Sequence, residues 1–196
     1  MNDLVLASKS ASRQSMLDAA QVAYTAQPAA IDERAIEAGL IDFAPAEIAE
    51  ALSVAKAAAI AAQQPSALVL GSDSLVVVKG RRFDKPANRR EAADHLRFFS
   101  GKVLELHSAA ALVRGSTCEW SGADTARLHV RPLSEAFIEA YLEHEWPEVS
   151  HTVGVFRIEA MGVQLFSHIE GDQFTVLGMP LLPVLGALRE LDVIVS

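Results

Sequence analysis

The chain has few cysteines and few aromatic residues, and it lacks long uninterrupted apolar runs. Cys118 is the one cysteine among 196 residues, which excludes an internal disulfide and fits a reducing compartment. Polar residues break the apolar stretches well before the roughly 20 residues needed to cross a bilayer, so no membrane partner is expected. The opening residues 1–10 lack the basic start and long apolar region of a secretory signal. These absences predict a cytoplasmic protein.

Positive charge is also scarce. The chain has 17 Lys and Arg against 25 Asp and Glu, a net charge of −8. Nucleic-acid backbones favour extended basic surfaces, so no nucleic-acid partner is expected. The basic group between Arg81 and Arg90 could attract a polyphosphate or simply begin a solvated helix. Apolar residues make up 51% of the chain, enough for the core of one domain over residues 1–196.

One acidic residue stands out because it follows an apolar run. Residues Leu68–Pro86 read LVLGSDSLVVVKGRRFDKP. The run Ala67–Leu70 predicts a buried strand, Gly71–Ser74 a turn or a close approach to a ligand, and Leu75–Val78 a second strand. A buried carboxylate costs several kcal/mol unless it meets a cation, a donor or water. Asp73 is therefore either the cap of a turn or a functional carboxylate.

The opening segment offers a candidate phosphate site. An apolar strand over Leu4–Ala7 precedes a hydroxyl-rich turn and a helix from Arg13. Ser10 or Ser12 fits the N-cap of that helix. Helix N-termini attract anions, and an Arg side chain adds a fork of donors. Ordinary helix capping explains the same residues, so both interpretations stay open.

Strand and helix patterns alternate along the rest of the chain. Their mixture of hairpin and crossover connections predicts an α/β fold with a mixed, strongly bent sheet flanked by helices around a cleft. The expected helices are one from Pro45, Arg89–Phe99, one from Ser134 to Glu143, and Pro183–Leu191; the expected strands are Val103–Val113, Glu119–Val130 and Val163–Ile169.

Short motifs along the whole chain resemble one known family. Residues Ala7–Arg13, ASKSASR, are similar to the A-S-x-S-x-x-R opening of the Maf family of nucleoside triphosphate pyrophosphatases, once called septum formation inhibitors. Six further matches follow in the family's order: Asp32-Glu33, Ala55-Lys56-Ala57, Gly71-Ser72-Asp73, Lys85-Pro86, Ser100-Gly101, and Gly171-Asp172 through Gly178-Met179-Pro180-Leu181.

The resemblance implies a hydrolase of acid anhydrides that cleaves a nucleoside triphosphate to the monophosphate and pyrophosphate with Mg2+, Mn2+ or Co2+. It implies a Maf/ITPase-like fold of two lobes around a nucleotide cleft and a role in cleansing nucleotide pools. Asp73 matches the general base, and Glu33 with Asp73 would hold the metal. The substrate-binding residues that it implies are Ser8, Ser10, Arg13, Lys56 and Lys85.

These residue types also suit phosphoryl transfer on physical grounds. Cations offset the negative charge that gathers on the phosphate oxygens, and carboxylates hold a metal or polarise water. Each residue has an ordinary alternative. Lys56 could be a solvated helix residue, Glu33 could occupy a first helical turn, and Lys85 could end a strand.

Departures from the family pattern point to a particular base. Val103 and Leu104 replace a Thr-His pair common in the family, and Phe156 and Glu159 replace its Tyr and Gln. A carboxylate only accepts hydrogen bonds, and a methylated guanine offers N1–H and N2–H donors and positive charge. Glu159 is therefore a candidate base-binding residue, and the chain resembles the 7-methyl-GTP branch more than the dTTP and UTP branch.

Two rival functions and one partner stay open. A non-catalytic regulator of septum formation or cell division would bind a triphosphate through the same residues, and a hydrolase of another phosphate ester would release orthophosphate. Dimers are common in the family. Phe137, Tyr141 and Trp146 could form a homodimer surface or belong to the core.

Overall fold

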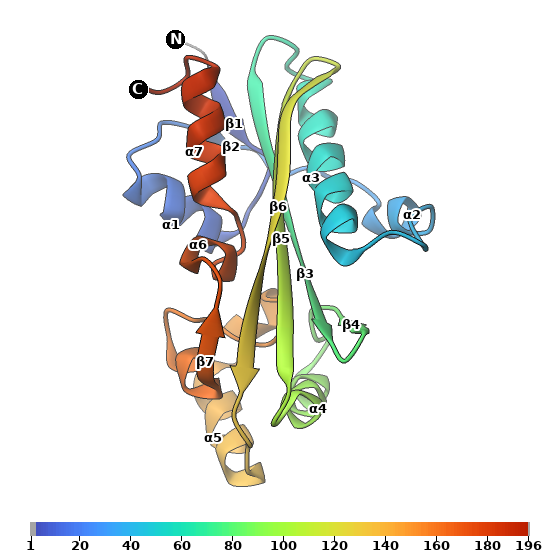
Figure 1. Ribbon diagram of the computed structural model, residues 1–196, viewed down its shortest axis with the longest axis vertical. Helices are drawn as coiled ribbons and strands as arrows, with labels where there is room; N and C mark the ends of the chain where they lie inside the picture. Colours follow the sequence, from blue (N-terminus) through green and yellow to red (C-terminus); the bar gives the residue numbers. More distant parts are fainter. Residues whose placement is uncertain (1–2, 196) are drawn as a thin grey trace. The chain divides into compact units, whose positions relative to one another are not determined.

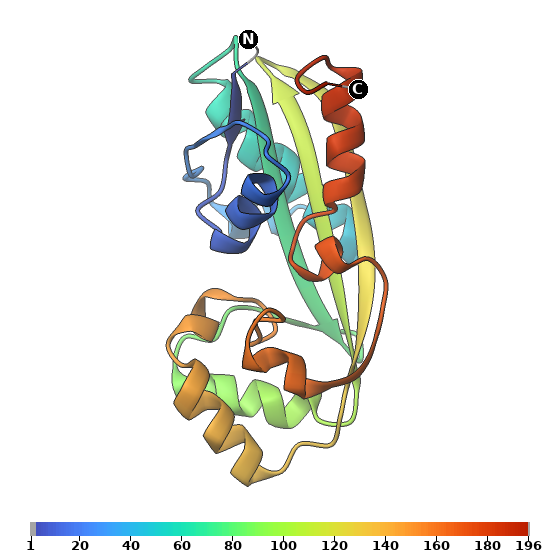
Figure 2. The same ribbon diagram turned by 90° about the vertical axis from the view of Figure 1, so that its left-hand side faces the viewer.

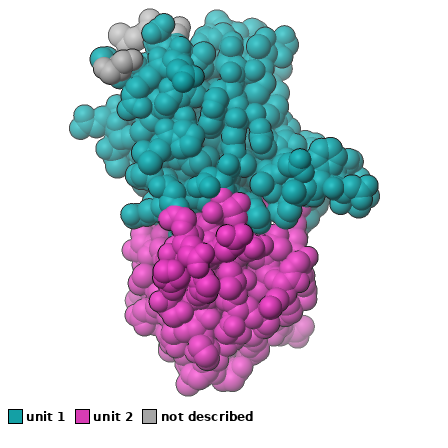
Figure 3. Space-filling view, viewed as in Figure 1, with its two compact units in different colours: residues 1–74, 107–124, 172–196 teal, residues 75–106, 125–171 magenta. Residues whose placement is uncertain are grey.

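The computed structural model describes residues 3–195, and the chain divides into two compact units (Figure 3). Unit 1 comprises residues 1–74, 107–124 and 172–196, of which 1, 2 and 196 lie outside the described residues. Unit 2 comprises residues 75–106 and 125–171. Three strands contribute residues to both units: β3 (Leu68–Val78), β5 (Val103–Arg114) and β6 (Thr117–Val130).

The strands form one mixed sheet in the order β2-β1-β3-β5-β6-β7, with β4 paired to β3 (Figure 1). This confirms the predicted α/β class. The strands are β1 (Leu4–Leu6), β2 (Thr25–Ala26), β3 (Leu68–Val78), β4 (Arg81–Phe83), β5 (Val103–Arg114), β6 (Thr117–Val130) and β7 (Phe166–Glu170). The helices are α1 (Ala11–Ala19), α2 (Glu33–Glu37), α3 (Pro45–Ala61), α4 (Arg89–Phe99), α5 (Glu135–Glu145), α6 (Gln173–Val176) and α7 (Leu181–Glu190), with 3-10 turns η1 (Glu148–His151) and η2 (Met161–Leu165).

In unit 1 the alternation of apolar side chains along β1 and β3 produces two separate cores. Leu4, Leu6, Leu68 and Leu70 point to one face and pack with α1 and α7. Val5 and Val69 point to the other face and pack with Ala57, Ile60 and Ala61 of α3. The helices accordingly cover both faces of these strands (Figures 1 and 2). This period of two is what a sheet buried on both sides requires.

The predicted turn at Gly71–Ser74 is wrong. β3 runs without a break from Leu68 to Val78, and all 11 of its residues are buried. Gly71 serves a close approach instead, because a Cβ there would lie 2.1 Å from the Ser53 carbonyl oxygen and 2.8 Å from the Ala57 backbone nitrogen of α3. The glycine thus allows α3 to pack directly against the strand that carries Asp73.

Unit 2 is built from antiparallel pairs and two helices. β4 pairs antiparallel with the end of β3, and β7 pairs antiparallel with β6. Phe83 of β4 packs edge-on against Phe99 of α4, with ring centroids 4.7 Å apart. The Asn88 and Ser134 side chains accept hydrogen bonds from the first turns of α4 and α5. These caps fit the residue types expected at helix starts.

The structure decides between several sequence alternatives. Tyr141 is fully buried and donates its hydroxyl to the Val155 carbonyl at 2.9 Å, so it belongs to the core, whereas Phe137 and Trp146 are partly buried. The strand expected from Val163 begins only at Phe166, because η2 precedes it. Among residues 3–195, no helix is both long and apolar enough to span a bilayer.

Candidate active site

Asp73 meets a cation, as the cost of burying a carboxylate requires. Its side chain is 10% exposed, and Oδ1 lies 2.5 Å from Lys56 Nζ. The same ammonium lies 2.9 Å from Oε1 of Glu33. Lys56 therefore connects the two carboxylates predicted to hold a metal. Its own side chain is 14% exposed, so it is not the solvated helix lysine of the alternative interpretation.

Helix geometry brings these three residues together. Glu33 occupies the first turn of α2, where the Asp32 side chain accepts a hydrogen bond from the Ala35 N–H at 3.0 Å. Lys56 projects from α3 beside the Gly71 contact with β3. Asp73 follows Gly71 by two residues on β3, so both point to the same face of the sheet. The face that packs on α3 is thus also the face that carries the carboxylate.

The opening turn forms the second part of the site. Ser10 is the N-cap of α1, with its Oγ accepting from the Arg13 N–H at 3.5 Å, whereas Ser12 donates its hydroxyl to the Leu177 carbonyl at 2.7 Å. Ser8 accepts from the Ser10 N–H at 3.2 Å and from Nη1 of Arg13 at 3.4 Å. These contacts confirm Ser10 as the cap and connect three of the predicted residues.

Arg13 reaches from this turn to β3 and to the C-terminal segment. Its Nη2 donates to the Ser74 hydroxyl at 3.1 Å, and its Nε donates to the Gly178 carbonyl at 3.0 Å. Burial lowers the pKa of Arg13, and the negative charges of Asp73 and Glu33 oppose this shift. The guanidinium stays charged because its ordinary pKa is so high. The influence of both carboxylates links Arg13 electrostatically to the Asp73 and Lys56 group.

Three buried serines near Arg13 were missed by the sequence interpretation. Ser72 and Ser74 flank Asp73 on β3 and point to the opposite face from it, and Ser108 comes from β5. Ser74 Oγ lies 3.1 Å from Ser108 Oγ and 3.0 Å from the Gly178 carbonyl oxygen. A buried serine gives no signal in sequence that separates a structural hydroxyl from a functional one. The G-S-D-S spacing is the one hint.

The site residues therefore lie on both faces of β3 where β1 ends. The pairing of β1 with β3 stops at Leu6 and Leu70, and the Ala7 N–H adds a last bond of 2.8 Å to the Leu70 carbonyl. Beyond that point the chain turns at Ser8, and this edge of β3 no longer has β1 beside it. Arg13 borders the edge from one face and the Asp73 carboxylate from the other.

Two of the predicted residues belong to unit 2. Lys85 is exposed between β4 and α4, and Glu159 is exposed between η1 and η2. The segment that carries Glu159 is anchored to α5, since Arg157 Nε donates to Glu145 Oε2 at 2.9 Å. Met161 N–H donates to the other oxygen of Glu145 at 3.2 Å. The remaining six predicted residues all belong to unit 1.

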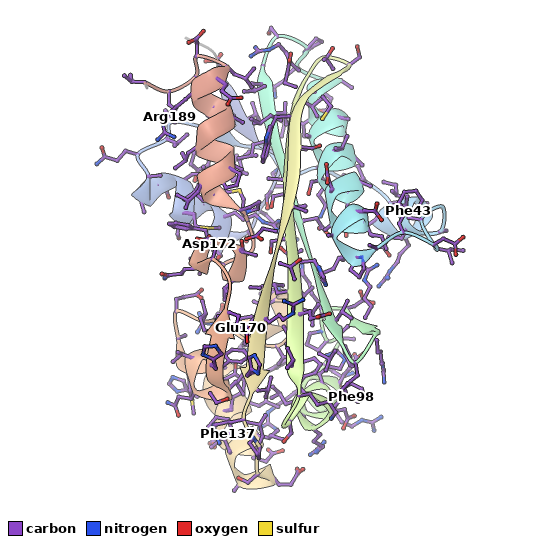
Figure 4. The ribbon with its side chains drawn as sticks, in the orientation of Figure 1. Phe43, Phe98, Phe137, Glu170, Asp172 and Arg189 are labelled. Atoms are coloured by element: carbon purple, nitrogen blue, oxygen red, sulfur yellow. The ribbon has the colours of Figure 1, made fainter. Side chains whose placement is uncertain are left out.

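Other features of the described chain do not add to this site. A surface hollow of about 440 Å³ is lined by Phe43, Glu47, Glu50, Ala51 and Val54, and none of these is a predicted site residue. Phe43 stands at the edge of the fold before α3 (Figure 4). Within residues 3–195, no group of three or more His, Cys, Asp or Glu side chains has an arrangement suited to a metal ion.

Comparison with known proteins identifies relatives over nearly the full chain. The nucleoside triphosphate pyrophosphatase 1 of Jannaschia sp. (strain CCS1) is 45% identical over 191 residues, 96% of each chain. The 7-methyl-GTP pyrophosphatase of Rhizobium meliloti (strain 1021) is 45% identical over 193 residues, 97% of each chain. Among solved structures, a HAM1 protein from Coxiella burnetii covers 66% of this chain and 73% of its own, with a TM-score of 0.42 and 17% identity.

The family model described as Maf-like protein matches residues 3–191. That range includes all the predicted site residues, those of unit 1 and those of unit 2. Together with the two sequence relatives, this match shows that the chain belongs to the Maf family.

Proposed function

We propose that the protein hydrolyses a nucleoside triphosphate between its α and β phosphates and releases the monophosphate and pyrophosphate. The observation that carries this proposal is the meeting of a buried carboxylate, two cations and a hydroxyl-rich turn at one edge of β3. The names of the relatives support the same reaction, since they are a nucleoside triphosphate pyrophosphatase and a 7-methyl-GTP pyrophosphatase. The substrate is accordingly a nucleoside triphosphate.

Arg13 and the turn that precedes it bind the phosphates. The guanidinium has five N–H donors, and its three bonds to protein oxygens leave two for a ligand. Ser8 and Ser10 supply hydroxyls beside it, and the start of α1 offers unpaired backbone N–H groups. A guanidinium suits phosphate because its fork matches two phosphate oxygens at once.

Asp73 acts as the general base toward the attacking water. Its Oδ1 accepts from Lys56, which leaves Oδ2 to accept a proton from water. Lys56 fixes the orientation of the carboxylate and adds positive charge where the transition state gathers negative charge. An aspartate is a weak base at neutral pH, so the base alone supplies only part of the rate enhancement.

A divalent cation completes the proposed site. The charges of Arg13, Lys56, Glu33 and Asp73 sum to zero, so these residues alone do not offset a triphosphate. The oxygens of Glu33 and Asp73 converge on one cation, the Lys56 ammonium, within 2.9 Å. Two carboxylates with substrate phosphates are a usual ligand set for Mg2+, and Glu33 and Asp73 would hold it here. When bound, the metal would supply Lewis-acid polarisation of a phosphate oxygen.

The base is proposed to be 7-methylguanine, with Glu159 accepting its N1–H and N2–H donors. The side chain of Glu159 is exposed, while the ion pair between Arg157 and Glu145 anchors its segment. Lys85 is proposed to contact the phosphates. A relative named 7-methyl-GTP pyrophosphatase supports this choice of base. Glu159 is tested through its effect on the choice of substrate rather than on folding.

Product analysis with an Asp73 variant tests the reaction. Purified protein is incubated with natural and modified triphosphates and Mg2+, Mn2+ or Co2+, and pyrophosphate and orthophosphate are measured separately. We expect pyrophosphate from the wild type. Asp73→Asn should lower kcat by roughly 10² to 10⁴-fold while nucleotide still binds, because a lost general base removes about that much rate.

The outcomes separate the rival functions. Unchanged turnover in Asp73→Asn would remove the carboxylate from the chemistry. Binding of nucleotide without turnover in the wild type would favour the non-catalytic regulator, and orthophosphate in place of pyrophosphate would favour a different phosphate ester. The control variant is Ser53→Ala. Ser53 is buried on α3 and donates its hydroxyl to the Ala49 carbonyl.

A further inference from the structure

We infer that Ser74 is a positioning residue that holds the Arg13 guanidinium in place for the polyphosphate. The inference rests on the proposed function in one respect, that Arg13 binds phosphate. Ser74 is 9% exposed and neighbours Asp73 on β3, but it points to the opposite face. Its Oγ lies 3.1 Å from Arg13 Nη2. The residue that follows the proposed base therefore contacts the side chain that is proposed to bind phosphate.

The direction of the bond between Arg13 and Ser74 is fixed, because a guanidinium only donates hydrogen bonds. Each serine hydroxyl has one proton. The shortest acceptor of Ser72 is the Ala109 carbonyl at 2.8 Å, and that of Ser108 is the Thr175 carbonyl at 2.9 Å. Ser74 has the Gly178 carbonyl at 3.0 Å. Ser74 can donate its proton to this carbonyl or to Ser108 Oγ at 3.1 Å, and in either case its lone pairs accept from Arg13 Nη2.

Arg13 takes neutral acceptors because no carboxylate within residues 3–195 forms an ion pair with it. Across the described residues, the acidic side chains form ion pairs with Lys56 and other cations but none with Arg13. Its acceptors are two hydroxyls and one carbonyl. Neutral acceptors fix the geometry of the guanidinium without cancelling its charge, which therefore remains available to an anion. An acidic residue in place of Ser74 would neutralise it.

The C-terminal segment supports the same arrangement from the other side. Gly178 has φ +101°, a conformation that favours glycine, and a Cβ there would lie 3.3 Å from Ser74 Oγ. Its carbonyl accepts from Arg13 Nε at 3.0 Å as well as from Ser74. Ser74 and Gly178 thus hold two different nitrogens of one guanidinium, which fixes both its position and its plane.

A double-mutant cycle on pyrophosphate binding tests this role. Inorganic pyrophosphate is titrated calorimetrically into the full chain of wild type, Ser74→Ala, Arg13→Lys and the double variant. Ser74→Ala should weaken binding about tenfold in the wild-type background, the effect of one hydrogen bond to a charged group. In the Arg13→Lys background it should change binding less than about twofold, since a single ammonium cannot replace the fork.

Two further variants separate positioning from general stability. Ser74→Thr keeps the hydroxyl and should bind within about threefold of the wild type. Ser53→Ala removes another buried serine hydroxyl of unit 1, whose bond to the Ala49 carbonyl is 2.7 Å long, and should leave binding unchanged. Wild-type affinity in Ser74→Ala, an equal loss in both Arg13 backgrounds, an equal loss in Ser53→Ala, or no rescue by Ser74→Thr would each overturn the inference.

The positioning role of Ser74 and the proposed reaction can be contradicted separately, because one is tested by binding and the other by turnover. Pyrophosphate binds without any bond being cleaved, so the cycle gives a result even if the protein hydrolyses no triphosphate, and that result would count against the proposed reaction alone. A wild type that hydrolyses triphosphates but shows no Ser74 effect on pyrophosphate affinity would count against the positioning role alone.

Discussion

Lys56 connects two carboxylates, and this contact distinguishes the chemistry of the site from a simple buried ion pair. A buried pair of one acid and one base is often a stability feature only. Here Glu33 is 46% exposed while Asp73 is 10% exposed, so one ammonium joins a solvent-facing carboxylate to an enclosed one. The arrangement leaves Glu33 accessible to a ligand and keeps Asp73 oriented.

Glu159→Gln should shift base preference without affecting the reaction itself. The substitution replaces a charged acceptor by a neutral amide. It should lower kcat/KM for 7-methyl-GTP about 10 to 100-fold, because hydrogen bonds to charged groups contribute about 1.5–3 kcal/mol. The value for GTP should fall less, because GTP lacks the positive ring charge. Steady-state kinetics with both substrates measure the ratio, and Glu143→Gln, exposed on α5, is the control. An unchanged ratio would contradict a role of Glu159 in base binding.

His95 should make stability depend on pH. Burial lowers its pKa and the charge of Glu91 opposes this, while its ring packs edge-on against Phe83 with centroids 5.0 Å apart. The folded state therefore binds fewer protons than the unfolded state below the ordinary value of about 6.5, and the free energy of unfolding falls as pH drops through that region. Above it, the contribution is complete.

Urea unfolding at about pH 7.5 and about pH 5.5 measures this effect. His95→Gln should show a smaller loss of stability between the two conditions than the wild type does. His144→Gln, an exposed histidine on α5, should behave as the wild type. The same loss in His95→Gln and wild type would show that the pH dependence originates elsewhere.

Individual residues were predictable where their signal is local. Ser10 caps α1 as its neighbours suggest, and the Arg13 side chain joins Ser8 from five positions away. Ser74 and Ser108 could not be predicted, because their contacts depend on a strand pairing between residues 34 apart and on carbonyls near residue 178. A serine in the sequence does not indicate which distant carbonyl or hydroxyl its side chain will contact.

At the scale of elements, the close packing of α3 on β3 determines whether Lys56 reaches Asp73. Gly71 allows this approach, and an added methyl group would overlap the backbone of α3. The helix must then move away from the strand or the strand must bend. Either response lengthens the Lys56 to Asp73 contact, so stability and activity are coupled at this glycine.

Gly71→Ala should therefore lower the free energy of unfolding by about 1–3 kcal/mol or more, the usual cost of overpacking a core. Gly186→Ala is a matched control, because this glycine lies within α7 and a Cβ there would meet no heavy atom within 4 Å. The control should be neutral or stabilising by about 0.5–1 kcal/mol. Urea unfolding compares the two, and an equal or smaller loss in Gly71→Ala would contradict the close-approach argument.

Helices were easier to predict from sequence than the central strand. The bounds of α4 agree with the prediction of Arg89–Phe99, because its cap and apolar spacing are local signals. The residue types of Gly71–Ser74 favour a turn or a close approach to a ligand. In the structure the neighbouring strands β1 and β5 and the close approach of α3 decide instead, and these interactions are not visible in a four-residue window.

At the scale of the whole molecule, the net charge of −8 repels anions, so any affinity for polyphosphate has to come from local cations. Inorganic pyrophosphate at about 100 times its Kd should stabilise the protein by about 2.7 kcal/mol. For a chain of this size, that corresponds to a rise in Tm of about 5–10 °C. Calorimetry in the presence and absence of pyrophosphate measures the shift.

Arg13→Lys at the same pyrophosphate concentration provides the comparison. Its shift in Tm should be clearly smaller, because the affinity that drives the shift is reduced. An identical shift in both proteins would mean that pyrophosphate binds somewhere other than beside Arg13.

The alternation of side chains along β3 makes this strand sensitive to insertions and deletions rather than only to substitutions. Removing Ser72 would exchange the two sides, so that the Asp73 carboxylate would face the guanidinium and the Ser74 hydroxyl would face the ammonium. The negative charge of Asp73 and the positive charge of Arg13 would then cancel each other. A change in the number of residues here would therefore invert both halves of the site at once, whereas a substitution alters one contact.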